Sequence, residues 1–214
     1  ITGTDVTKEV ADMVITDDNF VSIVSAIEEG RGIYDNIKKF VHYLLSCNAG
    51  EILVMFVSSL LGWPVPLLPI QILWINLVTD GLPALALGVD PVDPNIMRQP
   101  PRPTNEGVIT RSRALLMLFQ GGFIALCCLL AFSFVLYVEK GGLGRARTAA
   151  FIVLSCSQLF HAFNCRSTTE SLFKIGILTN KKLILATAVS FLVQMVVVYV
   201  PVLQKIFKTE PLEG

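Results

Sequence analysis

The fold is decided by residues 69–84, which read PIQILWINLVTDGLPA. This stretch belongs to an apolar run over residues 65–87, and about 20 apolar residues suffice for a helix that spans a bilayer. Polar side chains nevertheless stand within the run, at Asn76, Thr79 and Asp80. Their spacing places all three on one face of a helix. The stretch therefore predicts a membrane helix with a polar face.

The same run also contains residues that interrupt helices. Pro66 and Pro69 stand near its beginning, and Gly81 and Pro83 directly follow the polar group. A broken helix at membrane depth persists only where its freed backbone groups face protein or a hydrated cavity. We therefore expect a broken span, with backbone carbonyls freed beside Asp80.

Apolar runs continue on both sides of this stretch. Five predicted spans cover residues 40–61, 65–87, 114–138, 147–165 and 183–203. The fourth run is short, residues 149–163, and reaches spanning length only when it is extended at both ends. The hydrophobic content of 53% and the charged content of 16%, against about 25% in ordinary soluble domains, agree with this assignment. The expected fold is an all-α membrane bundle of five transmembrane helices.

Charge and cysteine usage exclude several classes of protein. Lysine plus arginine and aspartate plus glutamate are both 17, so the formal net charge is zero. A nucleic-acid partner is excluded, because such proteins need a basic excess. The five cysteines form no CxxC pair and mostly lie in apolar runs, so we expect neither a disulfide framework nor a zinc site.

The first 39 residues look like soluble structure that leads into the membrane. Residues 13–15 form an apolar triplet suited to a buried strand, in a small α/β remnant over residues 1–19. A capping cluster then precedes a stalk helix over residues 20–39. The chain has no initiator methionine or signal peptide, and its tail, residues 205–214, has no closing element. We expect a fragment of a larger protein.

Basic residues in the loops predict the orientation of the bundle. Those on the side of the stalk are Lys38, Lys39, Arg98, Arg102, Arg111, Arg113, Arg166, Lys174, Lys181 and Lys182. Those on the opposite side are Lys140, Arg145, Arg147, Lys205 and Lys208. The bias predicts a cytoplasmic N-terminus.

Carboxylates at membrane depth indicate a cation site. Glu51 lies near the middle of the first span, and Asn48 lies on the same helix face. Together with Asn76, Thr79 and Asp80 they supply two carboxylates and three neutral oxygen ligands, which suits a hard cation such as calcium. The alternative is a structural role, with asparagines that hydrogen-bond between helices and protonated carboxyls that pack.

Other polar residues are open to more than one interpretation. Gln158, in the fourth span, is either a sixth ligand or an interhelical hydrogen-bonding group. His42 and His161 stand near span ends, where we expect interfacial side chains, with a proton relay as the alternative. Acidic residues of the proline-rich loop are expected to be solvated: Asp90, Asp93 and Glu106.

These motifs resemble a known family. Residues 48–51 (NAGE), 69–84 and 96–102 (IMRQPPR) resemble the membrane half of calcium-transporting P-type ATPases, of the sarco/endoplasmic reticulum type and its bacterial relatives. Residues 3–8 and 11–20 resemble the end of that family's phosphorylation domain. A further run, residues 161–167, is similar to the bacterial branch. The resemblance covers nearly the whole chain.

The resemblance implies roles for these residues. Asn48 and Glu51 match ion ligands of the family's fifth membrane helix, and Asn76, Thr79 and Asp80 match those of the sixth. The predicted spans would be helices five to nine of ten, in a transport domain over residues 40–204. Aligned without gaps, Gln158 falls where two-ion pumps have a glutamate ligand on the eighth helix.

The resemblance also implies what acts outside this chain. Transported Ca²⁺ would bind here, whereas Mg²⁺ and ATP would act in cytosolic domains that the chain lacks, together with the phosphorylated aspartate. Partners would be membrane lipid and the N-terminal half of the pump, in a bacterial plasma membrane. Alternatives are a manganese pump, a secondary cation/proton exchanger without ATP, and an inert membrane piece with an incomplete site.

Overall fold

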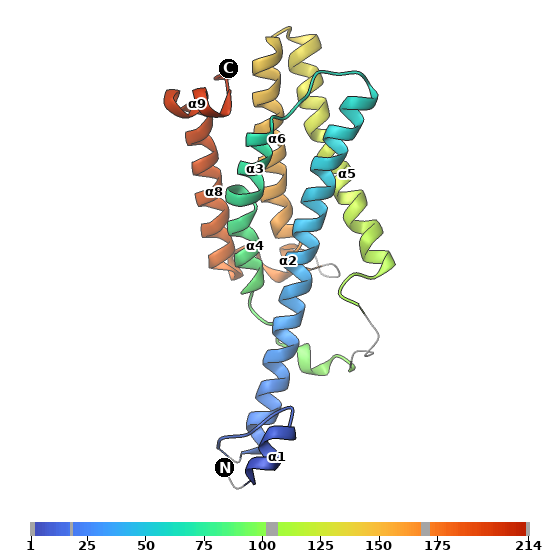
Figure 1. Ribbon diagram of the computed structural model, residues 1–214, viewed down its shortest axis with the longest axis vertical. Coiled ribbons are helices and arrows are strands. Elements are labelled where there is room, and N and C mark those ends of the chain that lie inside the picture. The colour runs from blue at the N-terminus through green and yellow to red at the C-terminus, as the bar shows by residue number, and fades with distance from the viewer. Residues whose placement is uncertain (1–2, 18, 102–106, 168–171, 213–214) are drawn as a thin grey trace.

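The computed structural model describes residues 3–17, 19–101, 107–167 and 172–212, which are helical with no strand. Figure 1 shows a bundle of long helices from which one helix projects toward the N-terminus. The elements in chain order are α1 (Asp5–Val10), α2 (Phe20–Leu60), α3 (Pro69–Trp74), η1 (Ile75–Thr79), α4 (Gly81–Gly88), η2 (Ile96–Arg98), α5 (Arg111–Ser133), η3 (Phe134–Val138), α6 (Gly142–Asn164), α7 (Leu172–Ile175), η4 (Ile177–Thr179), α8 (Lys181–Tyr199) and α9 (Pro201–Phe207).

The stalk and the first span form one continuous helix, α2, as the sequence predicts. Its 41 residues extend over about 60 Å. Asn19 caps the helix, and its side chain accepts a hydrogen bond from the Val21 amide at 3.0 Å. Beside the cap, Ser22 Oγ donates to Asp17 Oδ2 at 2.6 Å and lowers the pKa of Asp17. The part of α2 that projects from the bundle is therefore continuous with the part inside it (Figure 1).

The predicted N-terminal strand is wrong within the described residues. Residues 13–15 have no regular structure, and both Met13 and Val14 are exposed. A strand needs a neighbouring strand for its backbone hydrogen-bonding groups, and the described residues contain no strand. The short helix α1 precedes it instead.

Among the described residues, four stretches are long and apolar enough to cross a membrane: residues 20–60, 69–88, 111–138 and 181–199. The predicted fourth span, α6, has 23 residues and packs against α5, but it does not meet the same composition criterion. Polar side chains lower the mean hydropathy of α6. Four of them are buried inside the protein: Thr148, Ser155, Gln158 and His161. A helix that is shielded from lipid can carry such residues.

The second span is interrupted where the sequence predicts it. It begins at Pro69, four residues later than expected, and changes from α3 to the π-helical turn η1 before α4 begins. The Asp80 amide donates to the Ile75 carbonyl at 2.9 Å, a bond that reaches back five residues. Pro83 falls in the first turn of α4 and cannot donate to the Thr79 carbonyl. The irregular backbone thus lies directly at the polar face.

Close helix packing fixes the first span against the third. A Cβ atom added to Gly121 of α5 would lie 2.6 Å from the Ser46 carbonyl oxygen and 2.9 Å from the Gly50 amide nitrogen. Only glycine permits this approach of the two backbones, as is usual at crossings of membrane helices. The contact lies one residue before Glu51 and positions that side chain.

Candidate cation site

The Glu51 carboxylate joins three elements of the bundle. Asn76 Nδ2, from η1, donates to Glu51 Oε2 at 2.7 Å. Gln158 Nε2, from α6, donates to Glu51 Oε1 at 3.0 Å. Glu51 itself comes from α2 and is buried. The structure therefore brings together three of the six residues predicted from the sequence, including Gln158.

Asp80 lies at the end of η1 and is completely buried. Tyr43 donates its hydroxyl to Asp80 Oδ1 at 3.0 Å, whereas Asp80 Oδ2 has no hydrogen-bond partner among the described residues. The same is true of Gln158 Oε1. Buried polar atoms normally have partners. These acceptor oxygens suit the oxygen coordination that calcium requires.

Among the described residues, the two remaining predicted ones, Thr79 and Asn48, form no hydrogen bond with Glu51 or Asp80 that joins them to the site. Thr79 is buried, and its hydroxyl donates to the Ile75 carbonyl at 2.9 Å, which leaves its oxygen lone pairs available as acceptors. Asn48 is partly buried, three residues before Glu51 on α2, and takes no part in the hydrogen bonds that Glu51 accepts. Glu51, Asn76 and Gln158 are thus joined by hydrogen bonds, whereas the Asn48 amide lies outside this group.

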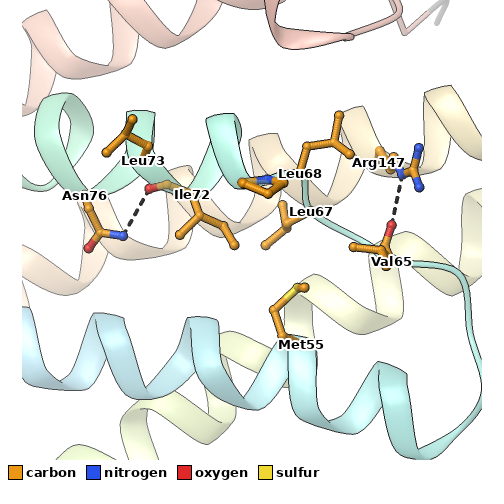
Figure 2. A pocket seen from close by; sticks show the side chains of 9 residues that line it. Met55, Val65, Leu67, Leu68, Ile72, Leu73, Asn76 and Arg147 are labelled. Atoms are coloured by element: carbon orange, nitrogen blue, oxygen red, sulfur yellow. Dashed lines mark hydrogen bonds between the residues drawn. The ribbon is translucent and has the colours of Figure 1, made fainter.

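A largely apolar pocket of about 650 Å³ adjoins the site, with Asn76 at one end and Arg147 at the other (Figure 2). Asn76 Nδ2 also donates to the Ile72 carbonyl at 3.0 Å, and Arg147 Nε donates to the Val65 carbonyl at 2.9 Å. Met55 of α2 faces the pocket from the opposite side (Figure 2). Asn76 therefore stands between the buried carboxylates and an open space.

Comparison with known proteins decides the family. The family model described as "Cation transporting ATPase, C-terminus" matches residues 64–214. The chain belongs to the cation-transporting ATPases. It is 50% identical to calcium-transporting ATPase 1 of Bacillus cereus and to the calcium-transporting ATPase of Bacillus subtilis, over 97% and 98% of the chain. It is 41% identical to human calcium-transporting ATPase type 2C member 1, over 99% of the chain.

The matched region is only part of each relative. The chain spans 25%, 23% and 23% of the lengths of these three proteins. The resemblance to P-type calcium ATPases seen in the sequence motifs is confirmed at the level of the family.

Besides Glu51 and Asp80, a third carboxylate of this chain is buried, contrary to expectation. Asp90, predicted to be solvated, accepts hydrogen bonds from Lys39 Nζ at 2.9 Å, Arg166 Nε at 3.1 Å and Asn180 Nδ2 at 2.6 Å. Asn36 of α2 donates to its backbone carbonyl at 2.8 Å. We call these five residues the Asp90 cluster. The cluster fastens the loop after α4 to α2 and to the beginning of α8.

The sequence analysis missed this cluster because Asp90 lies in a proline-rich loop, whose composition indicates exposure to solvent. A signal was nevertheless present, because Lys39, Asp90 and Arg166 each stand at the end of an apolar run on the same predicted side of the bundle. Such residues lie at one level of a helical bundle and can pair. Asp93 is exposed as expected, and Glu106 lies outside the described residues.

The two histidines lie inside the helix bundle. His42 and His161 are buried, with exposures of 3% and 5%, and their ring centroids lie 6.3 Å apart between α2 and α6. His42 belongs to the first span's helix, and His161 lies in the last turn of α6. Because α2 and α6 run antiparallel, the beginning of the first span lies beside the end of α6, and this brings the two rings together.

Proposed function

We propose that this chain is the cation-binding and translocation portion of an ATP-driven calcium pump. The observation that carries the proposal is the pair of buried carboxylates, Glu51 and Asp80, beside a π-helical interruption of a membrane span. A buried carboxylate is expensive at membrane depth unless something compensates its charge. The names of the chain's relatives support calcium as the transported ion.

We assign the calcium ligands to residues from three helices: Asn48, Glu51, Asn76, Thr79, Asp80 and Gln158. The amides of Asn76 and Gln158 donate N–H groups to Glu51. A side-chain amide carries its acceptor oxygen on the same carbon as its nitrogen. Rotation of both amides would therefore replace two N–H donors by two calcium-binding oxygens around the same carboxylate.

The interrupted helix gives a physical route for transport. Transporter sites commonly lie near the bilayer midplane where a helix is discontinuous. Movement of the stalk would be transmitted along α2 to Glu51, while Asn76 and Asp80 sit on the adaptable π-helical turn. The apolar pocket beyond Asn76 would then be part of the path by which the ion leaves.

The proposal also assigns topology and coupling. We place five spans in the membrane, with α6 as the fourth, as helices five to nine of ten. The N-terminus would be cytoplasmic, in a bacterial plasma membrane, and residues 1–19 would complete a phosphorylation domain. ATP hydrolysis with Mg²⁺ would occur in the rest of the pump, so the 214-residue chain alone should show no calcium-stimulated hydrolysis.

The charge count favours one transported calcium. Two calcium ions carry four positive charges, whereas Glu51, Asp80 and one fourth-helix carboxylate outside this chain would supply at most three negative ones. Gln158 adds an oxygen but no charge, and calcium affinity depends on ligand charge. We therefore propose one calcium per ATP, in a site built mainly on Asn76 and Asp80, with Glu51, the hydrogen-bond partner of Asn76, as its second carboxylate.

The substitution Asp80→Asn in the complete pump tests this function. It should abolish calcium-dependent phosphorylation from ATP but leave phosphorylation from inorganic phosphate possible, because only the ion site is changed. Asp93→Asn, on an exposed carboxylate, is the matched control and should behave as wild type. Normal calcium transport by Asp80→Asn would refute the assignment, and transport driven by a proton gradient without ATP would support an exchanger instead.

A further inference from the structure

We propose that His42, His161 and Cys165 form a binding site for a transition-metal ion, best suited to Zn²⁺, between α2 and α6. Each residue offers one ligand atom, and these atoms all lie within 4.8 Å of one another. All three side chains are buried. Small movements would bring them to the tetrahedral spacing that zinc requires.

The hydrogen bonding of His42 prepares one ring nitrogen as a ligand. His42 Nε2 lies 2.6 Å from Gln120 Oε1. An amide oxygen can only accept, so Nε2 carries the proton and Nδ1 keeps its lone pair. That Nδ1 atom is buried and has no hydrogen-bond partner among the described residues. Metal-bound histidines are held in the same way, by donation from the other ring nitrogen.

His161 and Cys165 supply the other two ligands from one helix end. They are four residues apart, and His161 Nε2 lies 3.2 Å from Cys165 Sγ. The same nitrogen lies 2.7 Å from Ser46 Oγ, whose hydroxyl lies within hydrogen-bonding distance of the His42 and Tyr43 carbonyls at 2.7 and 3.0 Å. Ser46 Oγ or a water can therefore occupy the fourth position.

The ligand set separates this site from the calcium site. Two imidazoles and a thiolate favour zinc and related transition metals, whereas calcium and magnesium prefer oxygen ligands. Cysteine spacing could not reveal it, because His42 belongs to α2 while His161 and Cys165 belong to the end of α6. A bound ion would join the two helices that also meet at Glu51 and Gln158.

Metal titration of the purified full-length protein tests the proposal. Zinc should bind at one ion per protein, and cobalt in its place should show the visible absorption of a tetrahedral thiolate site. Cys165→Ser and His42→Ala should abolish the cobalt spectrum and weaken zinc binding by more than about 100-fold. Gln120→Ala, which removes only the outer hydrogen bond, should weaken it by about 10–100-fold.

Cys156→Ser is the matched control, because Cys156 lies on the same helix outside the cluster. It should bind zinc as wild type does. A second measurement needs no variant: zinc should slow alkylation of Cys165, but not of Cys156, in the wild-type protein. Absence of this protection, or zinc binding that is unchanged in Cys165→Ser and His42→Ala, would overturn the proposal.

Discussion

Two buried carboxylates, Asp90 and Glu51, have different surroundings. Asp90 accepts hydrogen bonds from the cationic side chains of Lys39 and Arg166 and from the amide of Asn180. Glu51 accepts hydrogen bonds from two neutral amides. A carboxylate neutralised by the protein's own cations holds helices together, whereas one surrounded by neutral groups can take its counter-charge from a transported ion. The difference distinguishes a structural cluster from a candidate ion site.

The largest expected effect comes from removing the compensated carboxylate. Asp90→Ala removes the buried carboxylate that pairs with the Arg166 guanidinium and with Lys39, so it should lower the free energy of unfolding by about 3–5 kcal/mol. Thermal unfolding of the purified protein measures the loss. The control Asp93→Ala should change stability by no more than about 0.5 kcal/mol. Equal stability of the two variants would remove the distinction between the sites.

Glu51→Gln should show the opposite pattern. The substitution keeps the size of the side chain and one carbonyl acceptor, so we expect the unfolding free energy to change by less than about 1 kcal/mol. Calcium affinity, which depends on ligand charge, should fall by about 100-fold or more. Unfolding and calcium titration on the same preparation check both halves. Large destabilisation with unchanged calcium affinity would make Glu51 a structural residue.

Asn180→Ala should weaken the Asp90 cluster without touching the ion site. Asn180 Nδ2 donates to Asp90, and Asn180 Oδ1 caps α8 by accepting from the Leu183 amide at 2.8 Å. Losing the cap and the hydrogen bond should cost about 1–2 kcal/mol of unfolding free energy. Calcium affinity should stay within about twofold of wild type. A tenfold loss of affinity would instead show that the cluster and the site are coupled.

The smallest effect is expected from Gln158→Glu, which adds a second charge beside Glu51. If one calcium binds, the additional carboxylate should raise its affinity by less than about tenfold, because repulsion between the carboxylates offsets part of the gain. Calcium-dependent phosphorylation over a range of calcium concentrations measures the shift. A large loss of affinity would show that Gln158 acts by donating its N–H rather than by offering an oxygen.

Local patterns in the sequence predict much of this fold. Apolar runs and the cap at Asn19 predict α2, and the polar and helix-breaking residues around Asp80 predict the interrupted span. These features depend on neighbouring residues or on helix periodicity, which a single sequence displays directly.

Other features depend on contacts between distant segments and could not be predicted in the same way. The triplet at residues 13–15 has strand character but no partner strand, and Asp90 lies in a loop whose composition indicates solvent. The burial of His42 follows from the packing of α2 against α5 and α6. Composition alone does not reveal which helices shield one another, so the fourth predicted span, α6, also stays a prediction.

The central claim is that Glu51 and Asp80 hold the transported calcium. Equilibrium binding of radioactive calcium to the full-length pump, counted per phosphorylatable site, tests it most directly. We predict one calcium per site in the wild type and in Asp93→Asn, and none in Asp80→Asn at the same calcium concentration. Asp80→Asn that binds as much calcium as the wild type would contradict the account.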